Sequence, residues 1–204
     1  MLPFALNHMT VPNLRHDALF ALAARLGCIG VELRNDLGRP LFEGDRPEDV
    51  AAQARAQGIR IIGLSQVYPF NAWSDAIAAK VADLIETIEV LEQLNVVPHF
   101  KLVHDTFHHH LAGGGPFFPD YTGLIHISGV TDKTLAVNAM EDEHRVLVDR
   151  DDVLGNVAQI AALRDAGYRG AISFEAFSPL THQRSDIEAA LAESMRYIRT
   201  EIDA

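Results

Sequence analysis

The chain has 204 residues, of which 48% are hydrophobic and 22% charged, and its net charge is −11. These values are typical of a globular protein with one sizeable core, so we assign residues 1–204 to a single domain. The acidic balance argues against binding to nucleic acid, because such proteins need a basic surface to meet the phosphates. Cys28 is the only cysteine, which excludes an intrachain disulfide, and its apolar neighbours favour a core residue over a nucleophile.

The N-terminal residues lack the basic start and the long apolar stretch of a signal peptide. No apolar run in the sequence approaches the length that a membrane span requires. We therefore expect a cytoplasmic protein without a membrane partner, which agrees with the low cysteine content.

Short apolar segments and amphipathic segments alternate along the whole chain. The first strand is expected at 4–8, followed by a helix over 14–26 that Gly27 ends. A second strand at 28–33 precedes a helix that starts at the capping box Asp45-Arg-Pro-Glu48 and ends before Gly58. The third strand is expected at 59–64.

The middle of the chain contains an aromatic loop with Tyr68, Phe70 and Trp73, and then a long helix from Ser74 to about Asn95. The remaining strands and helices alternate in the same manner. The strands are expected at 100–104, 123–128 and 170–175, and the helices at 153–166 and 185–202.

Helical connections between nearly continuous apolar strands require a parallel sheet. No glycine-rich phosphate-binding motif follows the first strand, which argues against an open dinucleotide-binding fold. We therefore predict an α/β fold like a TIM barrel. The fold should be incomplete, because six strands are predicted where a (β/α)8 barrel has eight strands and about 250 residues.

Three of the predicted strands end in polar side chains that are suited to metal binding. The strand at 100–104 runs into Asp105, His126 lies near the end of the next strand, and Glu175 ends the last one. The C-terminal ends of parallel strands open on one face, so we expect these side chains to converge there. Oxygen and nitrogen donors of this kind form divalent metal sites.

Each of these residues also has a simpler interpretation. Asp105 can cap a helical turn that starts at Thr106, and a histidine in an apolar strand such as His126 is commonly a hydrogen-bonded core residue. A buried Glu175 needs either a metal or an arginine partner, because an unpaired buried carboxylate is costly. Their occurrence together favours the metal in all three cases.

The sequence resembles the xylose-isomerase-like TIM-barrel family of sugar isomerases and epimerases, whose relatives include hydroxypyruvate isomerase, keto-inositol isomerase and inosose dehydratase. The resemblance covers nearly the whole chain and rests on segments in matching order. These are Gly30-Val-Glu-Leu-Arg34, Phe70-Asn-Ala-Trp73, His104-Asp-Thr-Phe-His108, Leu124-Ile-His-Ile-Ser-Gly129, His144-Arg-Val-Leu147 and Gly170-Ala-Ile-Ser-Phe-Glu175.

The resemblance implies a site for Mn²⁺, Mg²⁺, Co²⁺ or Zn²⁺ in which Asp105, His126 and Glu175 are the last three of four ligands. It also implies that His108 and Glu32 contact the substrate. The family's first glutamate ligand has no counterpart, since the chain is shortened around residues 83–100. The glutamates there are placed on a helix, and we transfer the role to none of them.

Four further residues are candidates for substrate binding: Arg34, His8, Arg145 and Trp73. Arg34 instead pairs with Glu32 in the simpler interpretation, and Trp73 packs in the core. Arg145 either clamps a phosphate or carboxylate or belongs to a solvated charged loop.

The predicted function is a metal-dependent isomerase or epimerase of a small sugar, keto-sugar or hydroxy-carbonyl compound, acting through an enediolate with Glu175 as acid and base. The alternatives are a metal-dependent lyase, a sugar-binding remnant without activity, and an endonuclease-IV-like phosphodiesterase. Unpaired sheet edges in a six-stranded fold lead us to expect a homo-oligomer.

Overall fold

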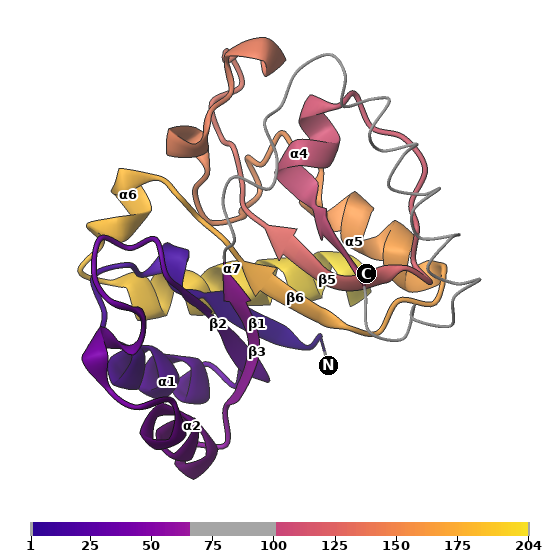
Figure 1. Ribbon diagram of the computed structural model, residues 1–204. Helices are drawn as coiled ribbons and strands as arrows, with labels where there is room; N and C mark the ends of the chain where they lie inside the picture. Colours follow the sequence, from indigo (N-terminus) through magenta and orange to yellow (C-terminus); the bar gives the residue numbers. More distant parts are fainter. Residues whose placement is uncertain (1, 66–100, 204) are drawn as a thin grey trace.

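The computed structural model describes residues 2–65 and 101–203, and Figure 1 shows their arrangement. Within these residues six parallel strands form one sheet in the order β3-β2-β1-β6-β5-β4. The strands are β1 Phe4–Asn7, β2 Gly30–Arg34, β3 Arg60–Ser65, β4 Leu102–Asp105, β5 Thr122–Ile127 and β6 Ala171–Phe174. The sheet is a curled half-barrel, which confirms the predicted TIM-barrel-like and incomplete fold.

Helices connect the strands, and α7 crosses behind the sheet in the view of Figure 1. The helices are α1 His16–Arg25, α2 Pro47–Ala56, α4 Thr106–Leu111, α5 Asn156–Asp165, α6 Pro179–His182 and α7 Ile187–Asp203. Short 3-10 turns are η1 His8–Thr10, η2 Leu41–Gly44, η4 Val137–Ala139 and η5 Asp142–His144. In the described ranges, none of the helices has both the length and the apolar character to cross a bilayer.

Most predicted elements are present with ends shifted by one to three residues. The predicted capping box at Asp45 is wrong, because α2 begins at Pro47 after Arg46 and no side chain caps it. Asp45 instead accepts a hydrogen bond from Arg15 at 3.2 Å. The predicted helix over 74–95 and the aromatic loop before it lie outside the described residues.

The alternation of side chains along the strands separates an apolar core from a polar face. One set of residues packs against the helices in the main core: Phe4, Leu6, Val31, Leu33, Ile125, Ile127, Ile172 and Phe174. The residues between them lie on the inner face of the sheet, where hydrogen bonds link Asn7, Glu32, Arg34, His126, Ser173 and Glu175. Cys28 lies in the core, as predicted, and is buried.

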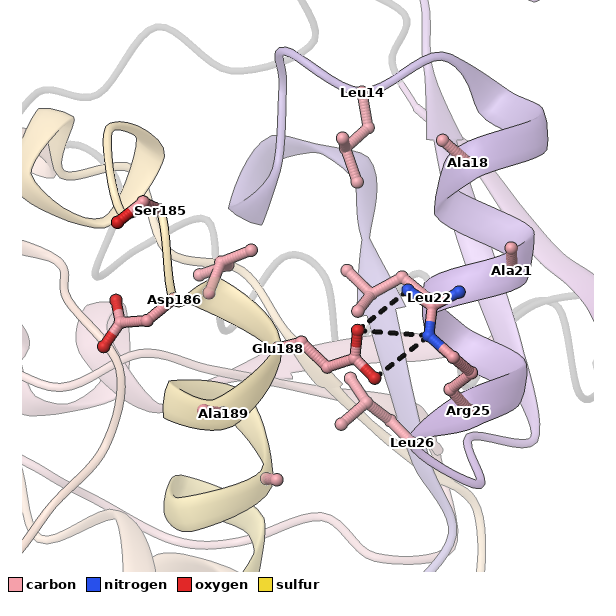
Figure 2. A pocket seen from close by; sticks show the side chains of 12 residues that line it. Leu14, Ala18, Ala21, Leu22, Arg25, Leu26, Ser185, Asp186, Glu188 and Ala189 are labelled. Carbon is pink, nitrogen blue, oxygen red and sulfur yellow. Dashed lines mark hydrogen bonds and ion pairs between the residues drawn. The ribbon is translucent and has the colours of Figure 1, made fainter.

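A groove of about 800 Å³ runs between α1 and the start of α7 on the helical side of the fold (Figure 2). Its lining is mostly apolar and includes Leu14, Leu22 and Leu26. Arg25 and Glu188 bridge the two helices across it, with 2.8 Å between Nη2 and Oε2. These residues lie apart from the polar inner face.

Candidate metal centre

Three strand ends bring Asp105, His126 and Glu175 together, as the sequence predicts. Asp105 ends β4, His126 lies near the end of β5, and Glu175 follows β6 directly. Each offers one ligand atom, and the three atoms lie within 4.8 Å of one another. The strands are neighbours in the sheet, with Asp105 paired in register with His126. We call these three residues the carboxylate–imidazole cluster.

The two oxygens of Asp105 have different tasks. Oδ1 accepts the backbone N–H of Phe107 at 2.9 Å and caps α4. Oδ2 lies 3.0 Å from Nη2 of Arg145, on the side of the cluster. The helix cap that the sequence left as an alternative therefore exists, and it leaves the second oxygen available to a ligand.

The imidazole of His126 lies between two buried carboxylates. Its Nδ1 is 3.1 Å from Oε2 of Glu175, and its Nε2 is 3.0 Å from Oε2 of Glu32. Burial disfavours the imidazolium, but the two carboxylates outweigh burial and raise the pKa of His126 to about 10.

Glu175 is buried but not unpaired. Its Oε1 accepts hydrogen bonds from Arg34 Nη1 at 2.8 Å and from Asn7 Nδ2 at 3.2 Å. Its Oε2 lies 3.0 Å from Arg145 Nη2. Burial raises the pKa of Glu175, but His126 and both arginines lower it by more than burial raises it. The carboxyl group is therefore ionised at neutral pH. Arginine partners thus account for this buried charge, as the simpler interpretation required.

Arg145 is 1% exposed, although it follows a charged surface segment. A backbone bridge turns the long loop inward, because Gly129 and Val146 exchange N–H···O bonds of 2.8 Å. A Cβ at Gly129 would lie 2.9 Å from the carbonyl oxygen of Leu147, so the close approach requires glycine. The guanidinium also donates to Ser128 at 2.9 Å. The solvated-loop interpretation therefore does not hold for Arg145.

Aromatic rings complete the surroundings of the two arginines. The Arg145 guanidinium carbon lies 5.0 Å from the ring centre of Phe107 and 4.5 Å from that of Phe177. Arg34 lies 5.5 Å from the same Phe177 ring. These cation–π contacts hold both guanidinium groups beside the cluster.

Glu32 and Arg34 do not hydrogen-bond each other, which was the simpler interpretation of this pair. Glu32 binds His126 and accepts a 2.5 Å hydrogen bond from the hydroxyl of Ser173. Arg34 donates to both oxygens of Asp36, at 2.8 and 2.6 Å, in addition to Glu175. Both side chains extend the cluster on the inner face.

The remaining predicted contacts are less close to the cluster. Nε2 of His108 lies 3.9 Å from Asp105 Oδ2, and its side chain is 48% exposed at the rim. His8 contacts the Leu14 carbonyl at 2.8 Å and Arg39 at 3.0 Å, so the structure does not join it to the cluster. Trp73 lies outside the described residues.

Sequence reasoning missed Asn7, Ser128, Ser173 and Phe177. Ser173 could have been predicted, because side chains two residues apart in a strand point to the same face, and Ser173 precedes Glu175 by two residues. Asn7 was missed because the first strand was expected to end at His8, one residue too late.

The cluster fits a divalent cation. Ligand bonds of about 2.1 Å place neighbouring donor atoms about 3.0 Å apart around an octahedral ion and about 3.4 Å apart around a tetrahedral one. The 3.1 Å between His126 Nδ1 and Glu175 Oε2 falls in this range, while the three ligand atoms as a set lie within 4.8 Å of one another. Three protein ligands with remaining open positions are typical of catalytic metal sites. Two carboxylate oxygens and one imidazole suit Zn²⁺, Mn²⁺ or Co²⁺.

The fold is an α/β half-barrel, and the cluster at its strand ends could hold a metal ion. The chain belongs to the xylose isomerase-like TIM barrel family, whose model matches residues 81–201. A comparison with curated proteins gave no match.

Solved structures of the same fold cover almost the whole chain. A xylose isomerase domain containing protein from Salmonella typhimurium LT2 is 25% identical, with a TM-score of 0.77 over 99% of this chain and 97% of its own. D-psicose 3-epimerase from Clostridium cellulolyticum H10, solved with D-tagatose, is 11% identical, with a TM-score of 0.63 over 98% and 99%. The IOLI protein, solved with a zinc atom, is 16% identical, with a TM-score of 0.59 over 98% of each chain.

Proposed function

We propose that this protein is a divalent-metal-dependent isomerase or epimerase that acts on a small sugar, keto-sugar or hydroxy-carbonyl compound. The observation that carries the proposal is the convergence of Asp105, His126 and Glu175 at one rim of the half-barrel. Membership in the xylose isomerase-like family and the fold shared with a sugar epimerase support it. The zinc atom in the IOLI protein supports a metal at this rim, without fixing which metal this chain uses.

In this proposal Asp105, His126 and Glu175 hold the cation. When bound, a divalent ion supplies positive charge that stabilises the two adjacent oxygens of an enediolate. Isomerisation also requires a base to remove the proton beside the carbonyl group. Glu175 is ionised and buried, so it can accept that proton at a carboxylate oxygen and return it to the neighbouring carbon.

Arg34 and Arg145 keep Glu175 ionised and fix its orientation. Each donates to a different oxygen of the carboxylate, so the group is held from both ends. His108 at the rim is the proposed contact for the polar groups of the substrate. Glu32, Arg34, Arg145, Trp73 and His8 remain substrate-contact predictions.

A lyase that eliminates water is the main alternative, because proton removal beside a carbonyl group is its first step as well. A sugar-binding remnant is the second alternative, because the family's first glutamate ligand has no assigned counterpart. An endonuclease-like phosphodiesterase is disfavoured by the net charge of −11. We propose a small-molecule substrate, a cytoplasmic location and no nucleic-acid or membrane partner.

The test combines metal content with product analysis. The His109→Ala/His110→Ala variant removes two histidines of the three-His run, which can bind metal adventitiously, and leaves the proposed rim residue His108 in place. After chelation and resupply with Mn²⁺ or Zn²⁺, we expect about one bound metal per chain and NMR-detected interconversion of ketoses or hydroxy-carbonyl acids. A product that lacks one water relative to the substrate would indicate the lyase. No turnover at saturating metal would indicate the binding remnant.

A further inference from the structure

We propose that Glu32 is a positioning residue that fixes the tautomer of His126 so that Nδ1 presents its lone pair to the cation. This inference rests on the proposed metal-dependent function. It assigns Glu32 a task at the metal centre in addition to the substrate contact that the family resemblance implies.

The two edges of the imidazole ring face different groups. Nδ1 faces Glu175 at 3.1 Å and therefore lies within the cluster. Nε2 lies on the opposite edge, 3.0 and 3.1 Å from the two oxygens of Glu32. A neutral imidazole has one N–H group and one lone pair, and a metal ligand must present the lone pair. With the proton on Nε2, the ring donates to Glu32 and offers Nδ1 to the cation.

Glu32 does not belong to the cluster itself. An ion bound at Nδ1 cannot also reach a carboxylate on the Nε2 edge, and Glu32 is absent from the described groups whose ligand atoms converge. Its place corresponds to that of the outer carboxylates that hold metal-bound histidines in one tautomer and orientation. Such residues act on the metal through the histidine.

The structure holds the Glu32 side chain firmly. Glu32 is 2% exposed, and the buried hydroxyl of Ser173 donates to its Oε1 at 2.5 Å. Gly63 lies opposite Glu32 in the sheet, and a Cβ there would lie only 3.1 Å from Glu32 Cγ. The glycine on the neighbouring strand thus makes space for the Glu32 side chain, which packs directly against it.

The experiment compares Glu32→Gln with the wild-type chain and with Glu43→Gln. Glutamine keeps a hydrogen-bond acceptor but removes the charge, and its amide can also donate to Nε2 and favour the other tautomer. Glu43 provides the matched control, because it pairs with another buried histidine, His16, away from the cluster. Zn²⁺ affinity is measured by calorimetry, and the histidine tautomers by ¹⁵N-detected NMR of the zinc-loaded and metal-free proteins.

We expect Glu32→Gln to bind Zn²⁺ about 10- to 100-fold more weakly, while Glu43→Gln binds like the wild type. The wild-type spectrum should show a metal-bound Nδ1 and a protonated Nε2 for His126. The metal-free wild type should show both ring nitrogens protonated, because two carboxylates raise the His126 pKa to about 10, whereas the neutral ring in metal-free Glu32→Gln should populate the other tautomer. A purely structural role for Glu32 would change thermal stability without changing the tautomer.

The possible failures are distinguishable. Absence of Zn²⁺ binding by the wild type would overturn the proposed function and this inference with it. Wild-type binding with unchanged affinity and tautomer in Glu32→Gln would overturn the inference alone. If Glu32→Gln does not fold, Ser173→Ala removes only the hydroxyl that anchors Glu32. We expect a several-fold loss of affinity for that variant, and wild-type affinity would contradict the inference.

Discussion

Nη2 of Arg145 lies 3.0 Å from Oε2 of Glu175. The same nitrogen lies 3.0 Å from Oδ2 of Asp105, so one guanidinium group joins two of the three residues of the carboxylate–imidazole cluster. Both contacts are shielded from water, because Arg145 is 1% exposed. The arginine therefore neutralises part of the negative charge that the cluster concentrates.

Replacing Arg145 by methionine should lower the free energy of unfolding by on the order of 3 kcal/mol, because it leaves buried carboxylates with fewer partners. Urea unfolding monitored by circular dichroism measures the change. Arg145→Lys should be intermediate, since lysine keeps the charge but cannot reach Ser128, Asp105 and Glu175 together. A methionine variant as stable as the wild type would show that Arg34 alone compensates Glu175.

Asp105 allows its two tasks to be separated by substitution. Asparagine at this position would still cap α4, because it is as good a cap as aspartate, but it would be a weaker ligand. We expect Asp105→Asn to keep the cap but to lose the charge that pairs with buried Arg145, and with it some stability, and to lose most of its affinity for Mn²⁺. Asp105→Ala should lose the cap as well, at a further cost of about 1 kcal/mol relative to Asp105→Asn. Equal metal affinity in Asp105→Asn and wild type would exclude Asp105 as a ligand.

Glu175→Gln should abolish incorporation of solvent deuterium into the substrate, because glutamine cannot accept the proton. Exchange is followed by proton NMR after metal loading. Glu193→Gln is the control, since Glu193 lies on the surface of α7 with a 72% exposed side chain. Undiminished exchange in Glu175→Gln would exclude the acid–base role.

His8 should make stability depend on pH below neutrality. Burial lowers its pKa from 6.5, and this outweighs the hydrogen bond with the Leu14 carbonyl, while the facing groups Arg39 and His16 lower the pKa and Glu43 raises it. The unfolded state then binds the proton more readily than the folded state. The contribution of His8 to stability is therefore fully present above pH 6.5. It is lost as the pH drops from there toward the pKa of His8 in the folded protein.

The measurement for His8 is the free energy of unfolding of wild type and His8→Gln between pH 5 and 8. Glutamine cannot titrate, so the wild type should lose more stability than the variant between pH 6.5 and 5. Parallel curves would show that His8 titrates in the folded protein as it does in the unfolded chain.

The end strands of the described sheet expose apolar side chains. Leu64 of β3 is 62% exposed and Val103 of β4 is 52% exposed, which is unusual for apolar strand residues. We expect light scattering to give the mass of a dimer or larger assembly. The Leu64→Lys/Val103→Lys variant should shift the mass toward the monomer. A wild-type monomer at all concentrations would refute this prediction.

The fold and the three central site residues could be predicted because parallel strands constrain where their ends lie. Asp105, His126 and Glu175 each follow or end an apolar run, and in a parallel sheet such positions share one rim. The convergence of these three side chains therefore followed from the strand pattern alone. The family resemblance added the substrate contacts expected of His108 and Glu32.

The errors arose where one residue or one long-range contact decides the outcome. His8 was preferred to Asn7 because the end of a strand is uncertain by one residue, and successive residues point to opposite faces. The predicted cap of α2 is absent, because the helix begins one residue later than the capping box requires and Asp45 pairs with Arg15 instead. The inward orientation of Arg145 depends on the bridge between Gly129 and Val146, and the local sequence pattern does not predict this bridge.

The shift in register between β2 and β3 has a steric consequence. Val31 pairs with Ile61 and Glu32 pairs with Gly63, so Ile62 is an additional residue in β3. Without this bulge, Ile62 would lie opposite Glu32 and its branched side chain would occupy the space that the carboxylate needs. One inserted residue in an otherwise ordinary strand thus decides whether a charged group can enter the interior of the half-barrel.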